Sequence, residues 1–415
     1  MKNGRIIDPV NGFDQIGTVW IDGGLILCVE AENAQIINGK RPPGWDAGSF
    51  LEINARGKWV VPGFVDLHVH FRDPGFEYKE DISSGCMAAK AGGFTKVCCM
   101  PNTFPVVDNA DTVNYIKDKA KDIPGIEIFV VGAVTKGQDG KTLSDMEDMA
   151  KAGICAISED GKTVQNSALM RSAMMQARRL GLPFFSHAED ESLGALALSE
   201  DIIVARDILL AKDTGCRTHF CHVSTAGSVE LIRKAKGEGL FVTAEATPHH
   251  FSLDESCINC DGNKKMNPPL RAKKDVEAIK IGLSDGTIDA IATDHAPHAP
   301  SEKNCDFENA LNGVIGLETS FAISYTELVK SGILSPIQLI EKMSTAPAKI
   351  LNIPAATISA DSPADILIVD AEHEYEISET DFASKSVNSP FVGQKVFGKP
   401  YHIEKFLSGE IFTPK

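Results

Sequence analysis

The sequence predicts an α/β protein with a (β/α)8 TIM-type barrel and a small β-sandwich domain built from both ends of the chain. Three observations support this fold class. Apolar strand-like runs alternate with helix-like stretches through the centre of the chain, short β-like pieces occupy both flanks, and histidines and aspartates recur where the central strands end. Alternating strands and helices are typical of parallel βα units, and eight such units close a barrel of about 250 residues.

The two flanks have the patterns of short strands. The first carries β-like pieces at 5–7, 17–21 and 25–29, separated by turn signals, and the last resumes this pattern at 364–370 and 394–398. Two β-rich flanks around a different centre indicate one small domain assembled from both ends. The predicted domains are a composite β-sandwich formed by 1–54 and 361–415 and a barrel formed by 55–360.

The centre of the chain contains eight apolar runs of strand length. The expected strands are 64–70, 95–100, 127–134, 154–158, 183–187, 218–222, 240–245 and 288–294. The helices expected between them include 78–91, 167–180, 202–212, 228–236 and 273–283. A doubly wound open sheet is the alternative, but the first strand is not followed by the glycine-rich phosphate turn that such a fold often uses.

Composition and charge restrict the class of protein. The chain has 415 residues, of which 43% are hydrophobic and 24% charged, and its formal net charge is −16. These values are ordinary for a globular protein, and the negative charge argues against nucleic acid or an anionic membrane as a partner. No apolar stretch approaches the roughly 20 residues of a membrane span, and the N-terminus lacks a signal-peptide pattern. Several cysteines lie in apolar runs, as in a reducing compartment, so we expect a cytoplasmic location.

The first central strand ends in two histidines separated by one residue, His68 and His70. Side chains two apart on a strand face the same way, so the pair can bind one cation from one side. The alternative is a pair of ordinary strand histidines. Further ligand types stand at the C-terminal ends of other strands, where barrels of this kind carry their chemistry. The six candidate metal ligands are His68, His70, Asp160, His187, His222 and Asp294.

Four histidines and two carboxylates are more than one tetrahedral zinc needs, so the set indicates a binuclear centre with one bridging carboxylate. Glu159 and Asp160 compete for the bridging position. Adjacent side chains tend to face opposite ways, so we expect only one of them to enter the site, and the residues alone leave the choice open. His219 stands three positions before His222, an odd offset on one strand, so we expect these two side chains to face opposite sides.

Polar side chains at the C-terminal ends of the same strands are candidates for binding an organic anion. The alternative for each is an ordinary solvent-exposed loop residue. Arginine is the strongest of them, because its planar guanidinium matches a carboxylate. The loop 299–313 is the candidate lid over these strand ends. The candidate substrate-binding residues are Arg72, Asn102, Asn267 and His298.

These residues resemble the amidohydrolase superfamily, and within it the bacterial dihydroorotases of the longer type. The likeness covers nearly the whole chain. It is most specific at Asp-Leu-His-Val-His-Phe-Arg-Asp-Pro-Gly in 66–75, Thr-Ala-Glu-Ala-Thr-Pro-His-His in 243–250 and Ile-Ala-Thr-Asp-His-Ala-Pro-His in 291–298. The shorter phrases that match lie at 100–103, 186–189, 221–225 and 266–271.

The resemblance implies two zinc ions per subunit, bridged by Asp160 and a hydroxide, and so favours Asp160 over Glu159 as the ligand. One ion would be held by His68, His70 and Asp294, and the other by His187 and His222. The resemblance also implies that Arg72 and Asn102 hold the substrate carboxylate, with His298 assisting and Asn267 contacting the ring.

The activity implied is the reversible cyclisation of N-carbamoyl-L-aspartate to L-dihydroorotate in pyrimidine synthesis. In the hydrolytic direction Asp294 is the expected catalytic residue, accepting a proton from the attacking hydroxide and passing it to the departing amide nitrogen. The expected partners are this small-molecule substrate, a second copy of the chain in a homodimer, and an aspartate transcarbamoylase.

Two alternatives stand beside this activity. One is a cyclic amidohydrolase for another ring, such as hydantoin or allantoin. Such relatives usually bridge their metals with a carbamylated lysine, and Lys162 comes too late for that position. The other is a non-catalytic subunit that only scaffolds a transcarbamoylase, which is expected to have lost metal ligands.

Overall fold

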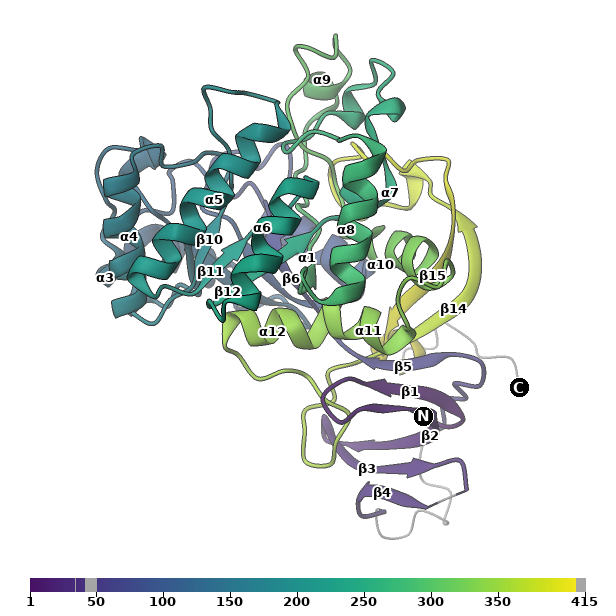
Figure 1. Ribbon diagram of the computed structural model, residues 1–415. Helices are drawn as coiled ribbons and strands as arrows, with labels where there is room; N and C mark the ends of the chain where they lie inside the picture. The colour runs from purple at the N-terminus through teal and green to yellow at the C-terminus, as the bar shows by residue number, and fades with distance from the viewer. Residues whose placement is uncertain (34, 42–50, 408–415) are drawn as a thin grey trace.

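The computed structural model describes residues 1–33, 35–41 and 51–407, which form two sheets with helices packed around the larger one (Figure 1). Residues 34, 42–50 and 408–415, which fall within the predicted β domain, lie outside the described residues. One sheet has eight strands in the order β13-β12-β11-β10-β9-β8-β7-β6, and the other has seven. The predicted fold class, a parallel barrel beside a separate sheet from the termini, is confirmed.

The eight-stranded sheet is the predicted barrel. Neighbouring strands pair in parallel throughout. A bridge between Val69 and His295 brings the two edges together, and the His70 backbone N–H donates to the His295 carbonyl at 2.8 Å. The strands are β6 (Phe64–Val69), β7 (Phe94–Cys99), β8 (Glu127–Ala133), β9 (Ala156–Ser158), β10 (Phe184–Ser186), β11 (Thr218–Phe220), β12 (Val242–Ala246) and β13 (Ala290–Ile291).

Strand β13 is much shorter than the expected 288–294. The Ala292 backbone N–H still donates to the Ala246 carbonyl at 3.2 Å, but the ladder does not continue, because the Thr293 backbone N–H donates to the Asp66 side chain at 3.1 Å instead. Asp294 then takes a left-handed φ of +47°, which a regular strand does not allow. The last strand therefore ends where the site begins.

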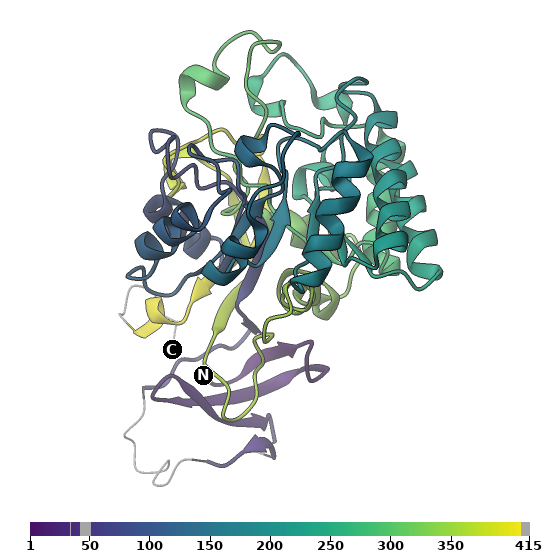
Figure 2. The same ribbon diagram turned by 90° about the vertical axis from the view of Figure 1, so that its left-hand side faces the viewer.

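Helices cover the outside of the barrel (Figure 2). Those that follow the strands are α1 (Ile82–Ala91), α2 (Ala110–Ala120), α3 (Met146–Ala152), α4 (Ser167–Arg179), α5 (Ala197–Thr214), α6 (Ala226–Gly237), α7 (Pro248–Ser252) and α8 (Lys273–Asp285). The later ones are α9 (Pro300–Lys303), α10 (Ser320–Ser324), α11 (Pro336–Ile340), α12 (Ala346–Leu351) and α13 (Glu404–Leu407). Helix α1 begins at Ile82 and not at Tyr78, because Asp81 caps it by accepting from the Ser84 backbone N–H at 2.8 Å.

The second sheet lies at the N-terminal end of the barrel strands and joins both flanks of the chain (Figure 1). Its order is β15-β14-β5-β1-β2-β3-β4, and only the β1–β5 pair is parallel. The strands are β1 (Gly4–Asp8), β2 (Phe13–Asp22), β3 (Leu25–Ala31), β4 (Ile36–Gly39), β5 (Trp59–Pro62), β14 (Ile366–Glu376) and β15 (Lys395–His402). Strand β5 belongs to this sheet although it falls within the range 55–360, so the exact domain boundaries remain a prediction.

Apolar side chains fill the interior of the barrel below the site. This core includes Leu67, Met100 and Phe185, and α12 closes it from the N-terminal end with Ile350 and Leu351. The open end at which an active site can form is therefore the C-terminal end of the strands. Within the described ranges, we find no helix long and apolar enough to cross a membrane.

Candidate active site

The six predicted metal ligands meet at the C-terminal end of the barrel. Asp160, which follows β9, lies at their centre. Its Oδ1 is 3.2 Å from His68 Nε2, 3.3 Å from His187 Nδ1 and 3.5 Å from His222 Nε2, and its Oδ2 is 3.4 Å from His70 Nε2. A carboxylate that faces four histidines in this way has the geometry of a bridge between two cations.

Asp294 completes one side of the cluster. Its Oδ1 lies 3.0 Å from His70 Nε2 and 3.6 Å from His68 Nε2. On the other side, His187 Nδ1 and His222 Nε2 lie 2.9 Å apart. The family resemblance implies a division into these two groups, while His68 also lies close enough to Asp160 and His222 to form a ligand group with them. The roles of these residues as ligands stay a prediction.

Glu159, the rival of Asp160, faces away from the cluster. Its carboxylate accepts from the backbone N–H of Thr135 at 3.0 Å and from the Thr135 hydroxyl. Only one of the two adjacent carboxylates therefore enters the site, as the alternation of side chains predicts.

Two buried atoms in the cluster are suited to a cation. His68 Nε2 and Asp160 Oδ1 are buried and, among the described residues, have no hydrogen-bond partner. Leaving such atoms buried without a partner is costly, and a metal ion between them removes that cost. Nitrogen and carboxylate oxygen ligands are the set that zinc accepts.

The histidines are held by groups outside the cluster. His70 Nδ1 lies 2.8 Å from Asn102 Oδ1, and His187 Nε2 lies 3.1 Å from Glu189 Oε2. These oxygens can only accept, so each ring carries its hydrogen on the outer nitrogen and presents the other nitrogen to the cluster. Asn102, expected to bind substrate, also positions His70.

Glu245 is a further residue of the site, one that the sequence pattern does not reveal. It is fully buried in β12, and its Oε1 lies 3.0 Å from His68 Nδ1. The sequence does show a glutamate within a predicted apolar strand. Because a carboxylate is rarely buried without a partner, this position indicates a buried contact. The partner itself lies 177 positions away in the chain, so its identity depends on the closure of the barrel.

The prediction that His219 and His222 face opposite sides was wrong. His219 Nε2 lies 3.0 Å from Glu245 Oε2 inside the barrel, and His222 lies in the cluster. The cause is the left-handed φ of +34° at His222, which breaks the alternation of β11. Arg72 has a similar φ of +61°, and strained backbone of this kind gathers at functional sites.

Burial and charge set the ionisation of the site. Burial raises the pKa of the Asp294 carboxyl, but the hydrogen bond from His70 and the nearby His68 outweigh burial and hold that pKa well below its usual range. His298 behaves in the opposite way: burial, together with the neighbouring Arg72 and Lys79, lowers its pKa to about 3, so its ring is neutral at pH 7.

A cavity of about 190 Å³ opens over the cluster, and all four predicted substrate-binding residues line it. Arg72 Nε donates to the Pro297 carbonyl at 3.2 Å, and His298 Nε2 lies 2.8 Å from the Asn312 carbonyl. Asn267 Nδ2 donates to Glu189 at 2.8 Å, at the edge of the cluster. Their contacts with a substrate stay a prediction.

The loop 299–313 contributes Asn312 and Gly313 to the wall of this cavity. Lys303, at the end of α9, is buried and donates to the carbonyls of Lys265, Leu311 and Gly313 at 2.8–3.0 Å. The base of the candidate lid is thus held in place. Closure of the lid stays a prediction.

Comparison with known proteins agrees with the fold and the cluster. The sequence profile of the amidohydrolase family matches residues 59–403, and the chain belongs to this family. Several curated relatives that are 43–45% identical to it over nearly the whole chain are named dihydroorotases. The chain is 45% identical to the one from Trichlorobacter lovleyi over 417 residues, covering 96% of this chain and 95% of that protein. It is 45% identical to the one from Citrifermentans bemidjiense over 418 residues, covering 96% of each.

Among solved structures, the L-hydantoinase (dihydropyrimidinase) from Arthrobacter aurescens is similar, with a TM-score of 0.84 and 26% sequence identity. The alignment covers 96% of this chain and 92% of that structure. The resemblance to the bacterial dihydroorotases of the amidohydrolase superfamily is confirmed by the sequence relatives.

Proposed function

We propose that this protein is a hydrolase acting on a cyclic amide and catalyses the reversible cyclisation of N-carbamoyl-L-aspartate to L-dihydroorotate. One observation carries the proposal: Arg72, a cation suited to a carboxylate, lines the same small cavity as the carboxylate-bridged histidine cluster. Relatives that are 45% identical over nearly the whole chain and named dihydroorotases support it.

The proposed cofactor is zinc, two ions per subunit. Asp160 would bridge them, since its two oxygens face histidines of both groups. When bound, the zinc ions supply a nucleophile at neutral pH by lowering the pKa of water, and they polarise the carbonyl under attack. The proposed ligands are His68, His70 and Asp294 for one ion, and His187 and His222 for the other, with Asp160 shared.

The chain's own residues bind and orient the substrate. Arg72 pairs with the substrate carboxylate, and Asn102 donates to it from the amide nitrogen left free by the contact with His70. His298, neutral at pH 7, lies beside Arg72 at 3.5 Å and assists it, while Asn267, which lines the same cavity, contacts the ring. These contacts place the ring amide carbonyl over the cluster.

Asp294 is the proposed catalytic residue. Ionised at neutral pH, it takes the proton released as a water oxygen bonds to the carbonyl carbon, and gives it to the amide nitrogen as the C–N bond breaks. Hydrolysis thereby adds one water across that bond. In the reverse direction Asp294 removes a proton from the ureido nitrogen as this nitrogen bonds to the carbon of the side-chain carboxyl group. Asp294 then gives the proton to the departing oxygen, which leaves as water as the C–O bond breaks, and the ring closes.

The hydantoinase-like alternative is weaker. The structural neighbours of this chain include hydantoinases, which a shared barrel explains. The lysine nearest the bridging position is Lys162, and its Nζ donates to the Gln138 carbonyl at 3.0 Å, not to the cluster. The scaffold alternative is disfavoured too, since the full set of candidate ligands is assembled.

We also propose a cytoplasmic location, a homodimer and an association with an aspartate transcarbamoylase. The small-molecule substrate has the direct support of the 190 Å³ cavity. The assembly proposals derive from the family resemblance.

The test is an assay of the purified, zinc-loaded protein with dihydroorotate, N-carbamoyl-L-aspartate, hydantoin and allantoin in parallel. We expect turnover of the first two and none of the last two. Turnover of hydantoin or allantoin alone contradicts the proposed pocket, and a protein that holds two zinc ions but turns over none of the four supports the scaffold alternative.

A further inference from the structure

One buried carboxylate contacts both halves of the ligand cluster from below. Glu245 Oε1 lies 3.0 Å from His68 Nδ1 and 3.3 Å from the backbone nitrogen of His222. Its Oε2 lies 3.0 Å from His219 Nε2. His68 and His222 are the proposed ligands of different metal ions. Glu245 therefore contacts one ligand of each ion.

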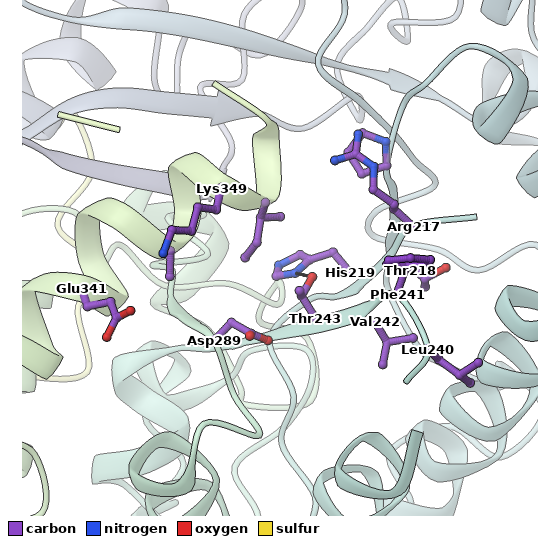
Figure 3. A pocket seen from close by; sticks show the side chains of 13 residues that line it. Arg217, Thr218, His219, Leu240, Phe241, Val242, Thr243, Asp289, Glu341 and Lys349 are labelled. Carbon is purple, nitrogen blue, oxygen red and sulfur yellow. Dashed lines mark hydrogen bonds between the residues drawn. The ribbon is translucent and has the colours of Figure 1, made fainter. Parts of the chain in front are cut away.

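The contacts continue away from the site, toward the N-terminal end of the barrel. His219 Nδ1 lies 2.9 Å from Thr243 Oγ1, and the His219 ring packs 4.8 Å from that of Phe185. Figure 3 shows His219 and Thr243 facing each other at a cavity of about 430 Å³ that opens among the first residues of β10, β11 and β12. Both oxygens of Glu245 are thereby held, and its carboxylate cannot rotate freely.

From this geometry we propose that Glu245 is a positioning residue, which sets the ring of His68 and the backbone of His222 for binding the two metals. The proposal rests on the proposed function, because it assumes the metal centre. A carboxylate only accepts, so it keeps the His68 hydrogen on Nδ1 and leaves the Nε2 lone pair facing the cluster. The same oxygen holds the backbone of His222, where the left-handed φ of +34° aims the ring.

Two substitutions of Glu245 test whether it acts by positioning the two histidines or only by placing a negative charge near them. Glu245→Leu removes both acceptors, and we expect zinc affinity to fall about 10- to 100-fold, the usual effect of losing such a support. Glu245→Gln should keep zinc affinity within about threefold, because its amide oxygen can still face His68 and His222 while its NH₂ group faces His219. The His219 ring then accepts at Nε2 and donates from Nδ1 to Thr243.

A double variant tests this tautomer argument. Thr243→Val alone should leave zinc affinity within about threefold of the parent, because Glu245 still fixes His68. Combined with Glu245→Gln, it removes the acceptor that the switched His219 ring needs, which favours turning the amide. Its NH₂ group then faces His68 and also the backbone N–H of His222, which loses its acceptor. His68 then carries its hydrogen on Nε2, and zinc affinity should fall at least about tenfold below that of either single variant.

The readout is zinc affinity of metal-depleted protein, measured by competition with a chromophoric chelator, together with the thermal unfolding of the same metal-free samples. Glu318→Leu is the control, because Glu318 is a partly buried carboxylate that, among the described residues, accepts from the backbone N–H groups of Ala383 and Ser384 and not from a histidine. It should change unfolding and leave zinc affinity unaltered. The double variant keeps the test valid if Glu245→Leu does not fold.

The outcomes distinguish the two proposals. A parent protein that binds no zinc contradicts the proposed function and the role of Glu245 with it. A parent that binds two zinc ions while Glu245→Leu binds them equally well, or Glu245→Gln loses as much affinity as Glu245→Leu, overturns the positioning role alone. Additive effects in the double variant also overturn it.

Discussion

Arg72 presents the only cation predicted from the sequence for the substrate pocket, and its position in the 190 Å³ cavity makes its role testable. Arg72→Ala should raise KM for dihydroorotate by roughly 10- to 100-fold, since a hydrogen bond to a charged group contributes about 1.5–3 kcal/mol. Arg72→Lys keeps the charge but not the planar fork and should recover only part of the loss. Steady-state kinetics check this, and an unchanged KM in Arg72→Ala contradicts the carboxylate contact.

Asp294 is expected to move the proton in both directions of the reaction. Asp294→Asn keeps the shape of the side chain and removes its basic form, so kcat should fall by at least roughly 10²-fold. Asp289→Asn is the control, because Asp289 precedes β13 at the opposite end and pairs with Lys236 at 2.6 Å. Zinc content measured on both variants separates a loss of metal from a loss of proton transfer. Normal turnover by Asp294→Asn rules out its catalytic role.

The candidate metal ligands could be predicted from the sequence, because each is a histidine or an aspartate at or just after the end of a predicted strand. His187 and His222 were found in this way although 34 residues separate them. The role of Glu245 and the inward direction of His219 could not be predicted. They depend on the left-handed backbone at His222 and on the contact between His219 and Glu245 inside the barrel. The alternation of side chains along a single strand predicts neither feature.

At the scale of elements, helix α1 packs closely behind the first strand. A Cβ on Gly85 would lie 2.4 Å from Cδ1 of Phe71, the residue between His70 and Arg72. Gly85→Ala should therefore destabilise the fold by about 1–3 kcal/mol and lower turnover, because the ring must move.

Gly237, the last residue of α6, provides the matched control. A Cβ there meets no atom within 4 Å, so Gly237→Ala should stabilise the protein by up to about 1 kcal/mol through the lower chain entropy of alanine. Urea unfolding of both variants checks the pair. Equal stability changes at the two glycines contradict the close packing of α1 on Phe71.

The positions of the elements were predicted better than their ends. Six of the eight barrel strands lie within the expected apolar runs, and β7 and β12 each extend one residue beyond theirs, since burial on both faces requires such runs. Their ends depend on side-chain contacts from elsewhere, as at β13, where Asp66 takes the Thr293 backbone N–H. Strand β5 belongs to the small sheet because it pairs with both β1 and β14. The sequence pattern of a single strand does not reveal its pairing partners.

At the scale of the whole molecule, His402 lies where the small sheet meets the barrel. Burial, and secondarily the nearby Lys90, lower its pKa to about 4, and its Nε2 has no hydrogen-bond partner among the described residues. The folded protein keeps this ring neutral, whereas the unfolded chain takes up a proton below pH 6.5. The contribution of His402 to stability is therefore present above pH 6.5 and is lost as the pH falls toward 4.

His402→Gln should reduce the loss of stability between pH 7 and pH 4 by about 3 kcal/mol. Urea unfolding of metal-free protein at pH 7, 5 and 4 measures this difference, and His373→Gln on the neighbouring β14 controls for the loss of a ring. The same pH dependence in parent and His402→Gln contradicts the burial of a neutral His402.

The most direct test of the account is a zinc titration of metal-free protein, with dihydroorotate hydrolysis and bound zinc measured on each sample. The ligand set assembled around Asp160 predicts that activity rises with zinc and levels off at two ions per chain. Full turnover without metal, or two bound ions with no turnover of dihydroorotate, contradicts the proposal that this cluster is a binuclear centre for opening and closing the dihydroorotate ring.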